Sequence, residues 1–90
     1  MLTVSKNIYV NDNGFVFNFY TGLTYGLNQT GTFILKRLQE RAPVPEIARG
    51  LEDAYGVGRK TVASDVDEFL QQLASLNLIS RDGVLPNDSV

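Results

Sequence analysis

Cysteine and histidine are both absent from this chain, and their absence excludes several kinds of active site. Without cysteine there is no disulfide, no thiolate metal site and no cysteine nucleophile. Without histidine the chain lacks the commonest general base and the commonest metal ligand. An enzyme needs a nucleophile with a base, a metal cage or a paired-carboxylate site, and without these two residue types the carboxylates and the glycine-rich segments are the candidates to check.

The acidic residues and the glycines do not form such a site. Most acidic residues fall on the polar faces of predicted helices or in turns. The adjacent pairs Glu52-Asp53 and Asp67-Glu68 point in different directions on a helix, so neither makes a two-carboxylate site. The glycines match no phosphate-cradling motif. We therefore predict that the protein is not an enzyme and needs no metal and no cofactor.

Long apolar runs and positive charge are also scarce. The apolar runs are too short to span a membrane, and the N-terminal MLTVSKN lacks the apolar core of a signal peptide, which predicts a cytoplasmic protein. The formal net charge is −2, and no lysine or arginine lies between Lys6 and Lys36. A polyanionic partner is therefore disfavoured, and we expect neither nucleic acid nor a membrane among the partners.

The first third of the chain has the pattern of a small antiparallel sheet. A length of 90 residues indicates one domain, which we place at residues 1–82, with 83–90 as a flexible tail. Residues 1–7 are expected to be loose. Three β-prone runs follow at residues 8–10, 15–20 and 23–27. The turn signals NDNG and TG separate them, which predicts a three-stranded meander.

The middle strand is unusually aromatic. Its alternation puts Phe15, Phe17 and Phe19 on one face and the residues between them on the other. A stacking surface for single-stranded nucleic acid normally has a basic groove beside the rings, and this segment has no charged residue. We therefore expect the three phenylalanines to face the core.

Three helices are predicted after the strands, at residues 29–40, 45–55 and 59–76. Asn28 is a suitable N-cap for the first helix. Gly31 is unfavourable in the first turn, and close packing against a neighbour would explain it. The third helix has the clearest apolar stripe, made of Val62, Val66, Phe69, Leu70, Leu73 and Leu76.

The element order is therefore β-β-β-α-α-α, in one α+β domain with a winged-helix-like layout. In that layout the third helix would read DNA, so a winged-helix DNA-binding regulator is the alternative function. The third helix, however, has one more acidic than basic residue, and the strands that would form the wing have no positive charge. Phosphate contacts supply most non-specific affinity for DNA, so this composition argues against DNA binding.

The strand at residues 23–27 suggests a different role. Proteins usually protect an edge strand with lysine, proline or a bulge, and LTYGL has no charged residue and no proline. Gly26 also permits close approach of another backbone. At an open edge, a peptide could add as a fourth strand. From the residues alone two readings stay open: the edge binds a peptide, or it is covered by a terminus or by a second subunit, the latter as a homodimer through this strand.

The chain also resembles the PqqD-like family over residues 15–79. The resemblance rests on an ordered set of segments: GLTYGLNQTGTFI, PEIARGL, YGV, DVDEFLQQL and LNLI. It implies a non-catalytic domain that binds the leader region of a ribosomally made precursor peptide. It further implies presentation of that precursor to a modifying enzyme, such as a radical SAM protein, a protease or a cyclase, as in stand-alone recognition elements of lasso-peptide systems.

The resemblance also implies where the leader binds, as a strand added beside the third strand and the third helix. The predicted peptide-binding residues are Leu23, Thr24, Tyr25, Gly26, Leu27, Asp65, Val66, Phe69 and Leu70. Two positions depart from the family pattern. Pro43 stands where serine or threonine often caps the second helix, and Gly58 where aspartate often caps the third.

Overall fold

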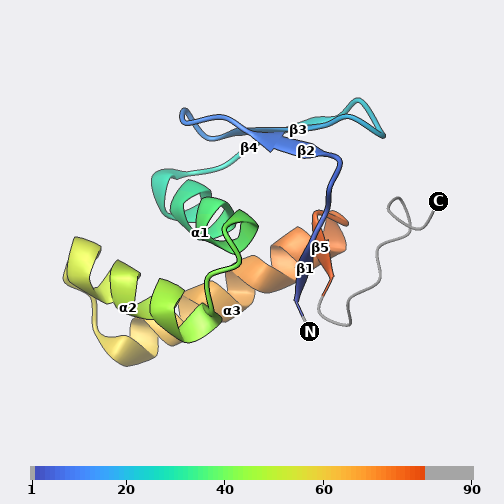
Figure 1. Ribbon diagram of the computed structural model, residues 1–90. Helices are drawn as coiled ribbons and strands as arrows, with labels where there is room; N and C mark the ends of the chain where they lie inside the picture. The colour runs from blue at the N-terminus through green and yellow to red at the C-terminus, as the bar shows by residue number, and fades with distance from the viewer. Residues whose placement is uncertain (1, 81–90) are drawn as a thin grey trace.

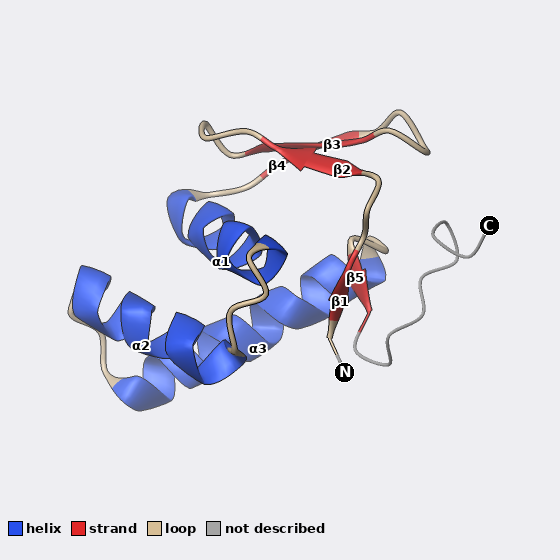
Figure 2. Ribbon diagram, in the orientation of Figure 1, coloured by secondary structure: helices blue, strands red, loops and turns tan. Residues whose placement is uncertain are grey.

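The structure, a computed structural model, describes residues 2–80 and places three helices beneath a three-stranded sheet (Figures 1 and 2). In chain order the elements are β1 (Thr3–Val4), β2 (Ile8–Val10), β3 (Phe15–Asn18), β4 (Thr24–Gly26), α1 (Gln29–Gln39), α2 (Val44–Tyr55), α3 (Arg59–Ser75) and β5 (Ile79–Ser80). The predicted α+β class and the order of the meander and the helices are confirmed. The tail predicted at 83–90 lies outside the described residues, and the boundary at residue 82 stays a prediction.

The central sheet has the order β2-β3-β4, with both pairs antiparallel. The chain reverses between β2 and β3 at the predicted turn, where the Asn13 N–H donates to the side-chain oxygen of Asn11 at 2.7 Å. Among residues 2–80, no strand pairs with the outer side of β4. The third strand therefore lies at an edge of the sheet.

The expectation that Phe15, Phe17 and Phe19 face the core is wrong. They are 57%, 38% and 61% exposed, whereas Val16 and Asn18 are 0% and 1% exposed. The inner face of the sheet carries the aliphatic core residues Ile8, Val10 and Val16 together with Asn18, and Figure 1 shows no helix over the opposite face. The alternation was predicted correctly, but the face that is buried was not.

Asn18 explains where β3 ends. Its buried side-chain oxygen accepts the N–H groups of Tyr20 at 2.9 Å and Thr21 at 3.1 Å. The Gly22 N–H donates to the Asn18 carbonyl, and the Asn18 N–H donates to the Leu23 carbonyl. The connection is therefore a loop that Asn18 organises, and both strands are shorter than the predicted ranges 15–20 and 23–27. The turn signal at Thr21-Gly22 correctly marks where the chain reverses, but the connection is longer than a two-residue turn.

The helices begin and end close to the predicted residues. The Asn28 side-chain oxygen accepts the Gly31 N–H at 2.7 Å, so the predicted N-cap of α1 is confirmed. Pro43 and Gly58 make no side-chain capping hydrogen bond, in line with their departures from the family pattern. Four residues of the predicted α3 stripe are buried, namely Val62, Val66, Leu70 and Leu73. Leu76, by contrast, is 38% exposed.

The prediction that the first residues of the chain are loose is wrong. Thr3 and Val4 form β1, which pairs antiparallel with β5 in the register Thr3 with Ser80 and Val4 with Ile79. The Ser5 N–H extends this pairing by donating to the Leu78 carbonyl at 2.9 Å. No helix within residues 2–80 is long and apolar enough to cross a membrane.

Candidate functional site

Two flanking hydrogen bonds fix the direction of the backbone groups of β4. The Leu27 N–H donates to the Gly14 carbonyl at 2.7 Å, and the Asn18 N–H donates to the Leu23 carbonyl at 2.9 Å. In an antiparallel ladder, hydrogen-bonded pairs alternate with pairs that are not hydrogen-bonded. Tyr25 lies midway between Leu23 and Leu27, so its N–H and C=O groups point to β3.

Thr24 and Gly26 therefore direct their N–H and C=O groups away from β3, to the edge that no described strand covers. Two donors and two acceptors stand there in the spacing of a β-ladder. The side chains of β4, in contrast, alternate between the two faces of the sheet. Tyr25 is half-buried on the inner face opposite Val16, whereas Thr24 and Gly26 are exposed on the outer face. The edge can thus pair with an extended peptide backbone.

A cavity of about 410 Å³ adjoins this edge on the inner side. Leu23 and Tyr25 line it from the sheet, and Leu76 lines it from the end of α3. Leu23 and Leu76 are 53% and 38% exposed, so apolar surface is available to a ligand in the cavity. Two of the predicted site residues, Leu23 and Tyr25, therefore come together with the end of α3.

A second cavity, of about 260 Å³, lies between the start of α1 and the middle of α3. Asp65 and Phe69 line it, together with Glu68 and Gln72. A Cβ atom built on Gly31 would lie 2.7 Å from the Phe69 ring. The close packing predicted for Gly31 is therefore present, and it fixes the ring of Phe69 beside the cavity.

The remaining predicted site residues lie deeper. Val66 and Leu70 are 3% and 6% exposed and line neither cavity, so they belong to the core. Leu27 is partly buried and packs against the core. Sequence reasoning missed Gln72 and Leu76. Their spacing from Phe69, at i+3 and i+7, puts all three on one face of α3 and is the signal that would have found them.

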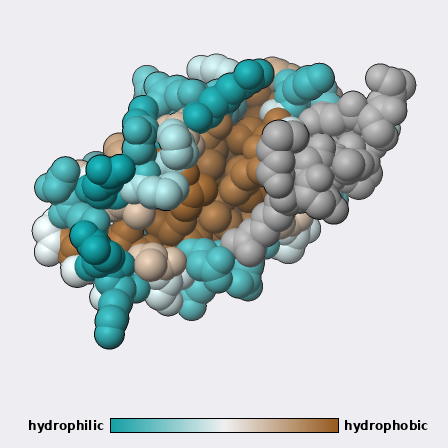
Figure 3. Space-filling model, turned by 60° about the horizontal axis from the view of Figure 1, so that its bottom comes forward, coloured by the Kyte–Doolittle hydropathy of each residue, from teal (hydrophilic) through white to brown (hydrophobic). Residues whose placement is uncertain are grey.

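A larger cavity, of about 690 Å³, lies elsewhere, between β1 and the connection from α1 to α2. None of the predicted site residues lines it. Figure 3, with the bottom of the molecule turned forward, shows a continuous apolar area bordered by hydrophilic residues. Size alone does not make this cavity the candidate site, because the unpaired strand edge lies elsewhere.

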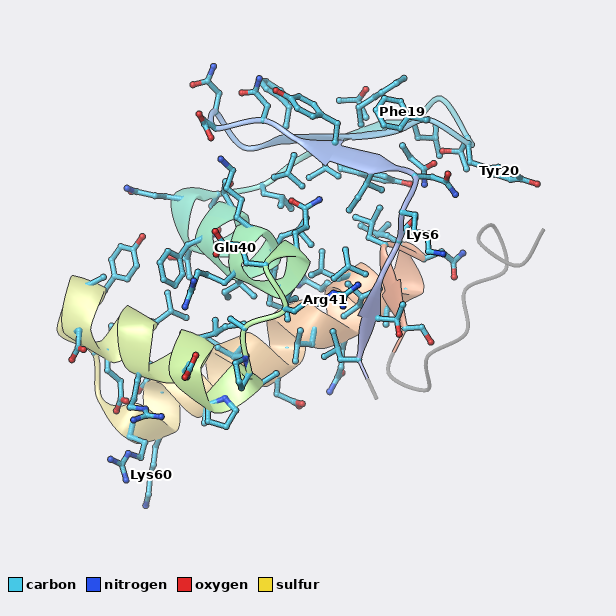
Figure 4. The ribbon with its side chains drawn as sticks, viewed as in Figure 1. Lys6, Phe19, Tyr20, Glu40, Arg41 and Lys60 are labelled. Carbon is cyan, nitrogen blue, oxygen red and sulfur yellow. The ribbon has the colours of Figure 1, made fainter. Side chains whose placement is uncertain are left out.

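Charge on α3 does not favour DNA. Lys60 projects from the start of α3, at the end of the molecule opposite Phe19 and Tyr20 (Figure 4). Arg59 lies 3.7 Å from Glu52, an acidic neighbour that offsets its charge. Farther along, Asp65 and Glu68 border the second cavity. Within residues 2–80, no three acidic side chains gather as metal ligands would.

Comparison with known proteins identifies the family of the chain. No curated protein matches the chain. A solved structure described as TbiB1 in complex with the TbiA(beta) leader peptide is 28% identical, with a TM-score of 0.78, over 88% of this chain and 95% of that one. A lasso peptide synthetase B1 complexed with the leader peptide is 22% identical, with a TM-score of 0.76, over 88% of this chain and 96% of that one, and shares the fold. The family model of coenzyme PQQ synthesis protein D (PqqD) matches residues 14–79, and the chain therefore belongs to the PqqD family.

Proposed function

We propose that this protein is a non-catalytic peptide chaperone that binds the leader region of a ribosomally synthesised precursor peptide and presents it to a modifying enzyme. The leader adds to β4 as a fourth strand. Its backbone bonds to Thr24 and Gly26, and its inward side chains enter the cavity beside Tyr25 and Leu76.

The open edge of β4 is the observation that carries this proposal. Two outward N–H groups and two outward C=O groups stand next to a cavity that Leu23, Tyr25 and Leu76 help to line, without the lysine, proline or bulge that usually protects such an edge. Backbone pairing supplies affinity and register, and pockets for alternate side chains supply specificity.

The similar structures support the identity of the ligand. Both are described as complexes with a leader peptide, and one of them as a lasso peptide synthetase B1. The DNA-binding alternative has no comparable support, because the exposed charges along the middle of α3 are acidic. The modifying enzyme is proposed to be a protease, a cyclase or a radical SAM protein that receives the bound precursor.

The leader peptide encoded beside the gene of this protein is the probe for a binding test by fluorescence anisotropy. A series of these peptides, each N-methylated at one backbone nitrogen, reads the pairing directly. Along an added strand, only alternate residues direct their N–H groups to β4. We expect alternate positions to lose affinity and the positions between them to tolerate the methyl group. A series without alternation, or an unmodified peptide that does not bind, contradicts the proposal.

A matched pair of protein variants tests the same contact from the other side. Thr24→Pro removes an outward donor, whereas Thr24→Val keeps it and has nearly the same shape. We expect the proline variant to lose affinity and the valine variant to keep it, with both still folded by circular dichroism. Equal affinities of folded Thr24→Pro and Thr24→Val refute strand addition at this residue.

A further inference from the structure

A peptide strand on β4 presents side chains to both faces of the sheet. Residues opposite each other on neighbouring strands have their side chains on the same face. Peptide residues opposite Thr24 and Gly26 therefore direct their side chains to the outer face, away from the cavity beside α3. The outer face of the sheet is thus a second surface that the side chains of an added peptide would contact.

Gly26 is the open position on that face, and the fold gives no reason for a glycine there. A Cβ built on Gly26 meets no atom within 4 Å, and its backbone is not in the left-handed region. A glycine within a strand weakens the strand and often marks the close approach of a ligand. Its partner in the ladder is Phe15, which is 57% exposed. An uncovered aromatic ring therefore lies one strand in from the edge.

The neighbouring outer position differs. Thr24 is paired with Phe17, so a threonine side chain stands between that ring and the edge. Phe17 also packs edge-on against Phe19, with 5.3 Å between the ring centroids and 82° between the ring planes. Access from the edge to an aromatic ring is therefore open at Gly26 and restricted at Thr24.

Strand spacing determines which side chain fits. Neighbouring strands lie about 4.8 Å apart, so the backbone of an added peptide is about 10 Å from that of Phe15. A peptide alanine or serine opposite Gly26 has a side chain that reaches only as far as the glycine. A leucine, methionine, phenylalanine or tyrosine extends across the glycine to the ring, a cross-strand contact that stabilises designed sheets.

We propose that Gly26 and Phe15 form a subsite that selects a long apolar or aromatic side chain at one outward-facing position of the bound peptide. The subsite rests on the proposed leader binding and adds a specificity determinant to it. No charged residue lies between residues 13 and 35, so β3 and β4, the two strands that form the subsite, carry no charged side chain.

Three exposed positions test the subsite with the fluorescein-labelled leader peptide encoded beside the gene. Phe15→Ser removes the ring, and Gly26→Val fills the space in front of it. Tyr9→Ser is the matched control, because Tyr9 is 55% exposed on the same face but lies on β2, far from the edge. We expect about a fivefold loss of affinity for the first two variants, the upper range of a cross-strand pair, and less than a twofold change for the control.

An alanine scan of the peptide then identifies the residue that occupies the subsite. We expect one alanine peptide to bind the wild-type protein about fivefold more weakly than the unmodified peptide does. The Phe15→Ser substitution should lower the affinity for that alanine peptide little further. In the same way, an alanine peptide that loses little further affinity with Leu76→Ser identifies a peptide residue on the inner face. Positions coupled to Phe15 and to Leu76 must be an odd number of residues apart, because the faces of a strand alternate.

The outcomes separate the two proposals. If the wild-type protein binds the peptide but Phe15→Ser and Gly26→Val behave like Tyr9→Ser, the subsite is refuted and strand addition stands. Coupling of Phe15 and Leu76 to positions an even number apart refutes it as well. Failure of the wild-type protein to bind the peptide refutes the proposed function and the subsite together. If Gly26→Val does not fold, Phe15→Ser and the odd-spacing rule still decide.

Discussion

The contact between Gly31 and Phe69 gives a quantitative prediction about how α1 lies against α3. Alanine at position 31 would gain up to about 1 kcal/mol from helix propensity. Its Cβ would also lie 2.7 Å and 2.8 Å from two carbons of the Phe69 ring, so the ring would have to move. Overpacking of this kind costs about 1–3 kcal/mol. We therefore expect Gly31→Ala to lower the free energy of unfolding by about 0–2 kcal/mol.

The same substitution should have the opposite sign once the ring is gone. In a Phe69→Ala background the clash with the ring is gone, and the remaining close contact of the Cβ is the milder one with the Asn28 side-chain oxygen at 3.1 Å. Gly31→Ala should therefore stabilise the protein by up to about 1 kcal/mol. For a domain of this size, each kcal/mol corresponds to a shift in Tm of about 4–8 °C. Urea and thermal unfolding of the four proteins, followed by helix circular dichroism, complete a double-mutant cycle with an expected coupling of about 1–3 kcal/mol.

A stabilisation of about 1 kcal/mol by Gly31→Ala in the otherwise unchanged protein would refute the close packing. So would additive effects of the two substitutions. The cycle also bears on binding, because Phe69 lines the second cavity and a displaced ring would change the shape of that cavity. A Gly31→Ala protein that folds well but binds the leader peptide weakly would link the contact between Gly31 and Phe69 to peptide binding at the second cavity.

Three further predictions concern single positions. Asn18→Ala should destabilise the protein by about 1–3 kcal/mol in urea, because the N–H groups of Tyr20 and Thr21 lose the acceptor that the buried Asn18 side chain supplies; unchanged stability would contradict this role. Gly58→Asp should raise the Tm, since a carboxylate at the start of α3 adds a cap and meets the helix dipole, for about 0.3–1 kcal/mol; a lower Tm would contradict it. If two copies pair through β4, sedimentation should show a concentration-dependent dimer that Thr24→Pro abolishes and Thr24→Val keeps.

The sequence was sufficient for the order of the elements but not for which face of the sheet is buried. The stripe of α3 and the cap at Asn28 are local signals, and both lead to helix boundaries close to the observed ones. Alternation in β3 is equally local. It shows that successive side chains lie on opposite faces of the sheet, but it does not show which face is buried. Val16 rather than Phe17 faces inward because of the neighbours on α1 and β2, which the strand itself does not encode.

Long-range pairing was the other limit. β1 is two residues long and pairs with β5 from the other end of the described chain, so no local pattern indicates it. The edge position of β4 was predictable from a meander with no charged residue or proline in its last strand. The cavity beside it was only partly predictable, because Leu76 was assigned to the core and is instead half-exposed.

The pairing of β1 with β5 has a consequence for how this fold can be joined to others. Thr3 and Ser80 are partners in the register, so the chain enters and leaves the described fold at neighbouring points (Figure 1). A domain with this property can be inserted into a loop of a host protein, or circularly permuted, with only a short linker. The ladder that closes the fold belongs to a different sheet from β4. Grafting through Thr3 and Ser80 should therefore leave the open edge of β4 intact.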